Sequence, residues 1–182
     1  MSKPFFVKLK NRGLLHIEGE DRLDFLQGLI SNDVGLLDCQ SAIYACLLTA
    51  QGKFLHDFFV VKGDDFLLID CEGGTRTQDL YRRFLMYRLR SKVQISIEDH
   101  NDVYAVIGAA PDSGYADPRH AALGYRVFEK PIDMGEQGFD AWDNLRIRHV
   151  VPDGSRDMEI EKSTLLECNI DKLNGVSFKK GC

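Results

Sequence analysis

The sequence predicts an α+β fold built on antiparallel sheets. Apolar runs at residues 42–49, 54–62 and 65–70 follow one another with short polar turns between them, which is typical of an antiparallel meander. A stretch with helical periodicity comes next, at residues 75–89, and two more strand-like runs follow it. Strands grouped around one or two helices in this order indicate a split β-α-β, or ferredoxin-like, arrangement.

Before the meander, the sequence predicts one strand and one helix. Residues 13–19 form a short extended run bounded by glycines. In residues 20–30, apolar side chains recur at helical spacing, and acidic residues stand at the start, where the helix dipole favours them. The polar triplet at residues 31–33 is typical of the turn that ends a helix.

From the meander onwards, turn chemistry separates the predicted elements. The four-residue connection at 50–53 contains glycine and indicates a hairpin. After the helix, strands are expected at 93–97 and 103–108, with a polar turn between them.

The last third of the sequence has weaker patterns. A loop at 111–118 and a short strand at 124–128 are expected, followed by a linker at 130–138 and a helix at 139–148. Periodicity is poor from residue 151 to residue 180.

Composition is that of an ordinary globular protein, with 44% apolar and 28% charged residues among 182. The net charge of −5 argues against nonspecific binding of nucleic acid by the whole surface. No apolar run is long enough for a spanning helix, and the N-terminus does not resemble a secretory signal or a transit peptide. We therefore expect a cytoplasmic protein that makes no membrane contact.

Thiols and imidazoles give no sign of a metal site. The five cysteines form an odd set without a Cys-x-x-Cys spacing, so neither a disulfide framework nor a zinc knuckle is indicated. The five histidines are scattered, with none paired at helical spacing. The glycine-rich motifs of dinucleotide, P-loop and esterase sites do not occur.

The densest charge feature is the run Arg82–Lys92, which contains five cations and no acid. Such a run is usually the solvated face of a helix. The functional alternative is a local anion site, because guanidinium groups pair bidentately with carboxylates or phosphates. A weaker third reading is a tRNA-binding surface.

Two further features carry both a structural and a functional reading. Asp57 interrupts an apolar strand, so it is either exposed on an edge or a buried carboxylate that accepts paired N–H groups from a heterocycle. Trp142 precedes Arg146 by one helical turn. This pair is either ordinary core packing or an aromatic plate beside a cation that holds a flat, anionic ligand.

Cys182 stands at the end of the sequence, directly after Lys179, Lys180 and Gly181. Neighbouring ammonium groups favour the thiolate, which is the reactive form. A frayed tail is the ordinary state of a last residue. The residues alone leave both readings open.

The segment 173–182, Leu-Asn-Gly-Val-Ser-Phe-Lys-Lys-Gly-Cys, resembles the start of the signature of the YgfZ family of folate-binding proteins, Lys-Gly-Cys-Tyr-x-Gly-Gln-Glu. Further matches fall in the family's order along essentially the whole chain: residues 25–34, 48–57, 86–92 and 145–147, with Pro152 behind them. The family is similar to the glycine-cleavage T-protein, a tetrahydrofolate-dependent aminomethyltransferase, and its members support the assembly or repair of iron-sulfur enzymes.

This resemblance implies a tetrahydrofolate-binding accessory protein that works with iron-sulfur cluster assembly proteins or client enzymes. Asp57 matches a folate-contacting acid, and Trp142, with Arg146 beside it, matches an aromatic residue that lines the folate cavity. Arg88 or Arg146 would face the glutamate tail of the folate. The rival implied activity is that of a true aminomethyl- or methyltransferase, in which Asp57 orients the folate.

The resemblance also implies a catalytic thiol, Cys182, beside Lys180. Two lobes are expected: residues 1–40 with 133–182, and a ferredoxin-like lobe of residues 41–132, with the folate cavity between them. The family's C-terminal β-barrel domain is absent, and we interpret the chain as truncated within the signature.

Overall fold

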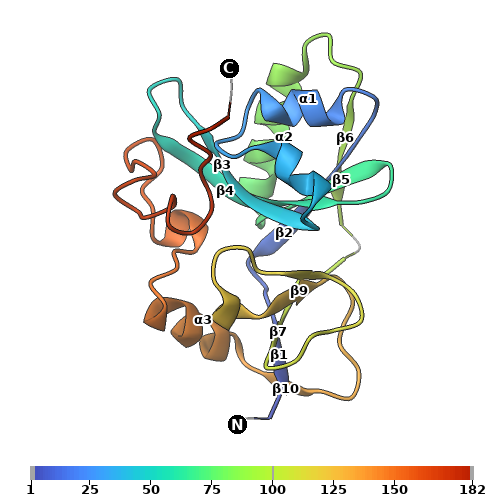
Figure 1. Ribbon diagram of the computed structural model, residues 1–182, viewed down its shortest axis with the longest axis vertical. Coiled ribbons are helices and arrows are strands. Elements are labelled where there is room, and N and C mark those ends of the chain that lie inside the picture. The colour runs from blue at the N-terminus through green and yellow to red at the C-terminus, as the bar shows by residue number, and fades with distance from the viewer. Residues whose placement is uncertain (1–2, 100, 181–182) are drawn as a thin grey trace.

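The computed structural model describes residues 3–99 and 101–180, and in them two five-stranded sheets lie one above the other along the long axis (Figure 1). The strand order of the larger sheet is β3-β4-β5-β2-β6, and all of its pairs are antiparallel. Its strands are β2 (Arg12–Glu18), β3 (Ala42–Leu48), β4 (Phe54–Lys62), β5 (Phe66–Glu72) and β6 (Gln94–Glu98).

The smaller sheet has the order β10-β1-β7-β9-β8, and only its β1–β10 pair is parallel. Its strands are β1 (Phe5–Lys8), β7 (Tyr104–Ile107), β8 (Tyr115–Ala116), β9 (Tyr125–Val127) and β10 (Gly135–Gln137). The α+β class predicted from the sequence is therefore confirmed.

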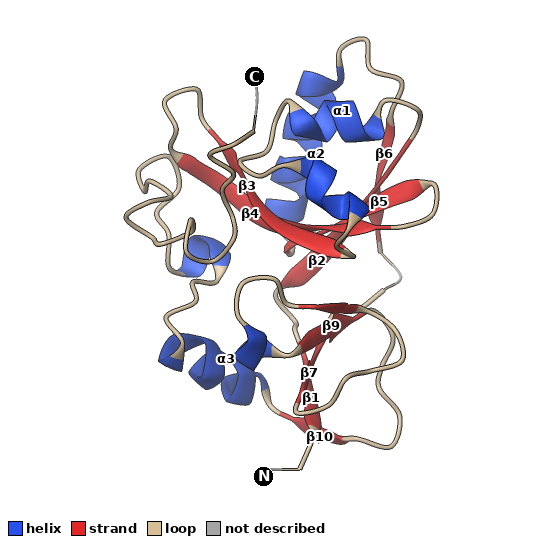
Figure 2. Cartoon of the chain, in the orientation of Figure 1, coloured by secondary structure: helices blue, strands red, loops and turns tan. Residues whose placement is uncertain are grey.

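Three α-helices complete the architecture: α1 (Arg22–Gln27), α2 (Thr75–Arg88) and α3 (Phe139–Arg148). Helices α1 and α2 cover one face of the larger sheet, and α3 lies beside the smaller one (Figure 2). Short 3-10 turns occur at Val34–Asp38, Ala121–Leu123 and Gly154–Arg156. No helix in the described ranges is long and apolar enough to cross a membrane.

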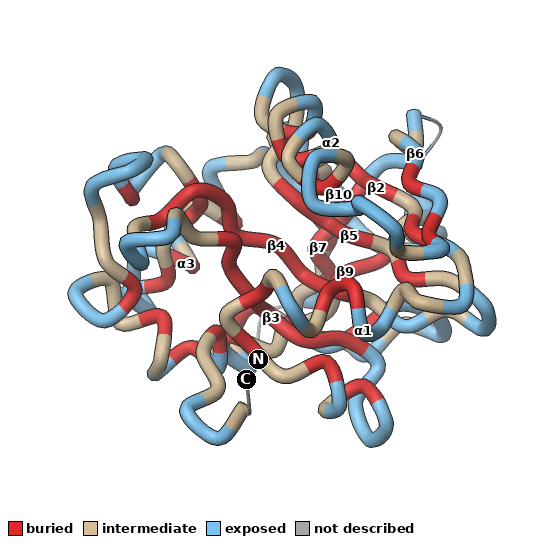
Figure 3. The backbone as a smooth tube through the Cα atoms, turned by 90° about the horizontal axis from the view of Figure 1, so that it is seen from above, coloured by how far each residue is buried: buried red, intermediate tan, exposed pale blue. Residues whose placement is uncertain are grey.

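The larger sheet is covered on both faces, which explains why β3 and β4 read as nearly continuous apolar runs. Ile43 and Phe58 point to the face under α1 and α2, whereas Tyr44 and Phe59 point to the opposite face. Residues 151–176 and β8 cover that second face. A buried path therefore runs along both strands through the middle of the molecule (Figure 3).

The sheets divide the chain differently from the lobe boundaries expected at residues 41 and 132. Strand β2 pairs with both β5 and β6, so the sheet that contains the meander begins at residue 12. Strands β7 and β9 pair in the other sheet, beside β1. The chain therefore passes from the smaller sheet to the larger one near residues 9–12, between β1 and β2. It returns near residues 98–104, between β6 and β7. The expected linker at 130–138 contains β10.

Gly19 directly follows β2, and the neighbouring backbone leaves no room for a side chain there. Its φ is +115°, and a Cβ atom there would lie 2.1 Å from the carbonyl oxygen of Lys92. The loop before β6 is thus packed directly against the end of β2.

We predict that Gly19→Ala lowers the free energy of unfolding by at least about 2 kcal/mol, since it adds backbone strain and a clash with another backbone atom. Gly135→Ala is the matched control, because a Cβ atom at Gly135 meets nothing within 4 Å. The control should stay within about 0.5 kcal/mol of wild type. Urea unfolding of both variants checks this, and equal losses would contradict the prediction.

Candidate functional site

The junction between the two sheets contains buried charges instead of an apolar contact alone. Asp57 on β4 and Asp70 on β5 are both almost completely buried. Asp70 lies opposite Phe59 in the β4–β5 pairing, and Asp57 shares the strand face of Phe59. Both carboxylates therefore point away from α1 and α2, towards the smaller sheet.

Asp70 is held by side chains from both sheets. Arg12 on β2 donates from Nε to Oδ1 of Asp70 over 2.6 Å. Arg126 on β9 donates from Nη1 to Oδ2 over 2.8 Å, and the Tyr115 hydroxyl on β8 donates to the same oxygen over 2.8 Å. One carboxylate thus ties the edge of the smaller sheet to the larger one.

Asp117, in the loop after β8, extends this network. The Arg119 guanidinium donates to it bidentately, over 3.0 Å from Nε and 2.8 Å from Nη2. Arg126 adds a 3.2 Å contact from Nε. The Phe59 ring lies next to all three guanidinium groups, whose central carbons are 4.1 Å (Arg126), 4.8 Å (Arg119) and 5.5 Å (Arg12) from its centroid.

The paired carboxyls remain ionised despite their burial. Burial alone would raise the pKa of Asp117, but Arg119 and Arg126 outweigh it and lower that pKa to about 2. Burial likewise opposes ionisation of Asp70, and Arg12 and Arg126 hold its pKa below the usual value.

Asp57 differs from these two carboxyls. Burial raises its pKa above the usual value, and the charges of Arg12 and Arg119 only partly offset that. Its Oδ2 accepts a 2.9 Å hydrogen bond from the Tyr44 hydroxyl, whereas Oδ1 has no hydrogen-bond partner among the described residues. The turn Gly154–Arg156 passes close by, since a Cβ atom at Gly154 would lie 3.0 Å from Oδ1.

Unpartnered polar atoms gather at this junction. Of the six buried side-chain atoms without a partner in the described ranges, five belong to it, and the sixth is Nε of Arg22. The five are Asn11 Oδ1, Arg12 Nη1, Asp57 Oδ1, Arg126 Nη2 and Trp142 Nε1. Buried polar atoms are almost always paired, so a polar partner such as water or a ligand suits this region.

Trp142 and Arg146 lie side by side, as their spacing predicts, and both are buried. Trp142 packs against residues of β1 and β7, and the Arg146 guanidinium lies 5.9 Å from its ring centroid. That guanidinium is already engaged by Asp143, over 2.6 Å, and by Asp157, over 2.5 Å. Trp142 connects to the charged junction through Arg126, 6.0 Å from its ring.

Arg88 does not join this cluster. It is exposed at the end of α2, and α2 covers the face of the larger sheet opposite to Asp57. The structure therefore does not bring Arg88 and Asp57 together. Strand geometry explains this, because alternate side chains of β4 point to opposite faces.

The signature segment lies against the turn after α1. The Lys180 ammonium donates to the carbonyl of Ile30 over 2.5 Å, and burial lowers its pKa. Ser31 Oγ donates to the carbonyl of Gly175 over 2.6 Å. Gly181 and Cys182, which complete the expected thiol centre, lie outside the described residues.

Asn32 links this segment to the charged junction. Its side-chain amide donates to the carbonyls of Asn174 and Tyr44, over 2.8 Å each. The hydroxyl of the same Tyr44 donates to Asp57. Hydrogen bonds made by Asn32 and Tyr44 thus connect the signature segment to the Asp57 carboxylate.

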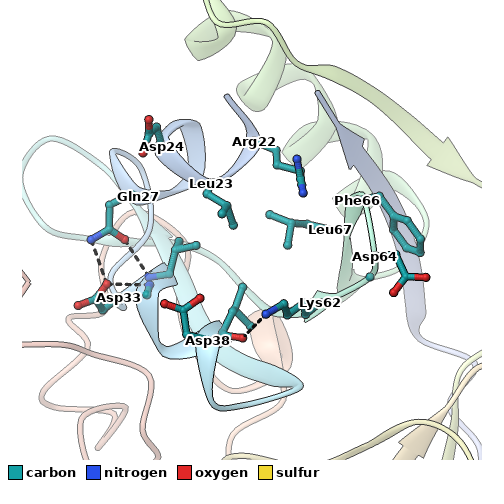
Figure 4. A pocket seen from close by; sticks show the side chains of 14 residues that line it. Arg22, Leu23, Asp24, Gln27, Asp33, Asp38, Lys62, Asp64, Phe66 and Leu67 are labelled. Carbon is teal, nitrogen blue, oxygen red and sulfur yellow. Dashed lines mark hydrogen bonds between the residues drawn. The ribbon is translucent and has the colours of Figure 1, made fainter. Parts of the chain in front are cut away.

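A separate pocket of about 330 Å³ opens between α1 and the β4–β5 turn (Figure 4). Leu23 and Leu67 line its floor, and Arg22, Lys62 and four aspartates surround it. It contains none of the site residues expected from the sequence.

No family model matches the chain. The chain is 30% identical to the mitochondrial iron-sulfur cluster assembly factor IBA57 of Homo sapiens, over 96% of this chain and 58% of that protein. It is 30% identical to the corresponding homolog of Mycosarcoma maydis, over 97% of this chain and 50% of the relative. The chain thus spans between about half and three fifths of these relatives.

The fold is similar to that of glycine cleavage system aminomethyltransferase T from Bartonella henselae. The TM-score is 0.52 at 16% identity, over 58% of this chain and 29% of that one. This likeness concerns the fold alone.

The expected cytoplasmic location is wrong. These relatives, and the homolog of Coccidioides immitis at 28% identity over 97% of this chain and 50% of the relative, are all named as mitochondrial. Their names point to a mitochondrial location instead.

We predict that the same Asp→Asn change has very different effects on the free energy of unfolding at two buried carboxyls. Asp117→Asn should cost about 3–5 kcal/mol, because it leaves the buried Arg119 guanidinium without its paired carboxylate and removes one of the two carboxylates that hold Arg126. Asp57→Asn should cost less than about 1 kcal/mol or stabilise the fold, because burial already disfavours the charged carboxylate there. Urea unfolding at pH 7 measures both, and a similar loss for the two variants would contradict this assignment.

Acid should weaken the junction through Asp117. A carboxyl whose folded pKa is lowered stabilises the fold above its unfolded pKa, here 3.8, and loses that contribution as pH falls towards about 2. The contribution is roughly 2 kcal/mol. The stability of wild type should therefore fall between about pH 5 and pH 2, and Asp117→Asn should show a smaller drop over the same window.

Proposed function

We propose that this chain is the folate-binding part of an iron-sulfur cluster assembly factor, in which tetrahydrofolate binds at Asp57 and the Cys182 thiol acts on iron-sulfur enzymes. The observation that carries the proposal is the unpartnered Oδ1 of Asp57, which is buried in a junction with four other unpartnered polar atoms. Each such atom costs roughly 1–3 kcal/mol if it remains unsatisfied.

The chemistry of the junction suits a reduced folate. A carboxylate with a free oxygen accepts N–H groups of a pteridine ring, and Asp57 offers such an oxygen. The free Nη1 of Arg12 and Nη2 of Arg126 are donors for the carbonyl or carboxylate oxygens of the same molecule. Trp142 would form the aromatic wall, with its Nε1 as a further donor.

Binding at Asp57 requires part of the chain to move, because only 1% of this residue is exposed. The turn Gly154–Arg156 is the nearest cover. Ser155 fastens it by donating to the Glu72 carboxylate, over 3.1 Å from the backbone N–H and 2.6 Å from Oγ. Both bonds are partly buried, and we assign this turn as the entry to the site because it is the segment that lies over Asp57.

The function of the whole protein would need a thiol beyond this cavity. A single cysteine cannot hold a cluster, since clusters usually take four thiolates. Cys182 would therefore act together with a partner chain, a second protomer or a client enzyme. The names of the relatives, which are iron-sulfur cluster assembly factors, support this role.

Calorimetry with tetrahydrofolate tests the cavity. Asp57→Asn should bind at least about tenfold more weakly than wild type, because the amide presents a donor where the ligand needs an acceptor. The matched control is Asp112→Asn, an exposed aspartate, which should bind like wild type. Circular dichroism spectra of both variants check that they are folded. Unchanged affinity in Asp57→Asn would reject the assigned site.

A complementation experiment tests the thiol in the complete protein. Cells that carry Cys182→Ala should lose most of the activity of oxidation-sensitive iron-sulfur enzymes, whereas Cys39→Ala, which removes an exposed thiol elsewhere in the chain, should keep it. Normal enzyme activity with Cys182→Ala would remove the thiol from the mechanism but leave the folate site standing.

A further inference from the structure

The end of α2 and the loop that follows it expose three large apolar side chains to solvent. The exposed fractions are 64% for Met86, 44% for Tyr87 and 87% for Leu89. This loop forms the top of the molecule in Figure 1, far from the smaller sheet. Single exposed apolar residues are normal, but three within four positions at one helix end are typical of a contact surface.

Leu89 also has an unfavourable backbone. Its φ is +42° and its ψ is −106°, a conformation that residues other than glycine rarely adopt and that costs about 1–3 kcal/mol. The flanking backbone is fixed, since the N–H of Ser91 donates to the Arg88 carbonyl over 2.8 Å and that of Lys92 donates to Asp21 over 2.7 Å. The chain thus holds Leu89 in solvent, against both its hydrophobicity and its backbone preference.

Unpaired cations surround these apolar residues. Arg82, Arg88 and Arg90 are exposed, and their side chains make no ion pair or hydrogen bond with any other residue in the described ranges. Elsewhere on the same helix, Arg83 is paired with Asp79 over 2.8 Å. Three free guanidinium groups at one place are notable in a chain with a net charge of −5, where acids are in excess.

We propose that this α2-end surface, made of Arg82, Met86, Tyr87, Arg88, Leu89 and Arg90, docks an acidic amphipathic helix of a partner protein. Carboxylates of that helix would pair with the free guanidinium groups, which are suited to bidentate contacts. Its apolar stripe would cover Met86 and Leu89. An open depression lined by Asp21, Tyr87, Leu89, Arg90 and Ser91 offers the place for one of its side chains.

A protein partner fits this surface better than RNA does. Tyrosine, methionine and arginine are the residue types enriched in protein interfaces. RNA binding draws mainly on phosphate contacts, and it leaves no use for the exposed side chains of Met86 and Leu89.

The surface is separate from the proposed folate site. Helix α2 packs on the face of the larger sheet opposite to Asp57, so both sites can be occupied at once. The inference therefore stands or falls independently of folate binding.

Fluorescence anisotropy with a synthetic helical peptide of about 18 residues tests the proposal. The peptide has a leucine stripe flanked by glutamates. Against wild type, the variant Arg82→Glu/Arg88→Glu/Arg90→Glu should bind it at least about tenfold more weakly, and Leu89→Ser about fivefold more weakly. A second peptide, with lysine in place of each glutamate, should bind the charge-reversed variant and restore the loss.

The matched control reverses three cations elsewhere: Lys10→Glu/Arg148→Glu/Lys172→Glu, all of them exposed and with the same change in net charge. This control should stay within about twofold of wild type. Exposed positions usually tolerate such substitutions, so the control should fold like wild type. Thermal melting of each variant checks this.

Two outcomes would overturn the proposal. In the first, both triple variants lose the acidic peptide equally, which would mean that only net charge matters. In the second, the peptide does not bind, but single-stranded RNA of about 20 nucleotides or phosphatidylserine vesicles bind wild type and not the charge-reversed variant.

Discussion

The pairing of buried charges between the two sheets is the constraint on which the rest of the molecule depends. Asp70 takes partners from β2, β8 and β9, so it can be satisfied only when both sheets are assembled. Removing one partner would leave a charge in the protein interior, which costs far more than an exposed pair contributes. Asp117 is buried as well, and its charge is compensated by Arg119 and Arg126. Once these pairs are made, Asp57 is, among the described residues, the buried carboxylate left with an unpartnered oxygen, and the position of the proposed site follows from this imbalance.

Local patterns in the sequence were enough to predict most elements but not how they assemble. The meander, α2 and α3 each depend on periodicity within a dozen residues, and the structure contains them close to the expected ranges. The division between sheets was not predictable in this way. It depends on the pairing of β2 with β5 and β6, whose paired residues are separated by 48 or more positions, and a short apolar strand carries no mark of its distant partner.

The candidate site shows the same contrast. Asp57 was visible because a carboxylate inside an apolar strand is costly to bury. Asp70, the last residue of the run predicted at 65–70, lies inside β5, gives the same signal and could have been found by it. Arg119 could not, because it lies in a short polar segment that resembles an ordinary loop. Arg126 stands inside the short strand predicted at residues 124–128, where a charge between apolar residues gives a similar signal. The resemblance placed Arg88 beside the folate. In the structure, α2 covers one face of the larger sheet and Asp57 points to the other face, so Arg88 and Asp57 lie apart.

Tyr44 has a consequence that reaches beyond its own hydrogen bonds. Its hydroxyl holds Asp57, and its carbonyl accepts from Asn32, which also holds the backbone of Asn174. A molecule that displaced Tyr44 on binding to Asp57 would act through Asn32 on the signature segment. Thermodynamic linkage then requires the reverse effect with the same coupling free energy. Ligand binding at Asp57 and the position of the signature segment would therefore be coupled.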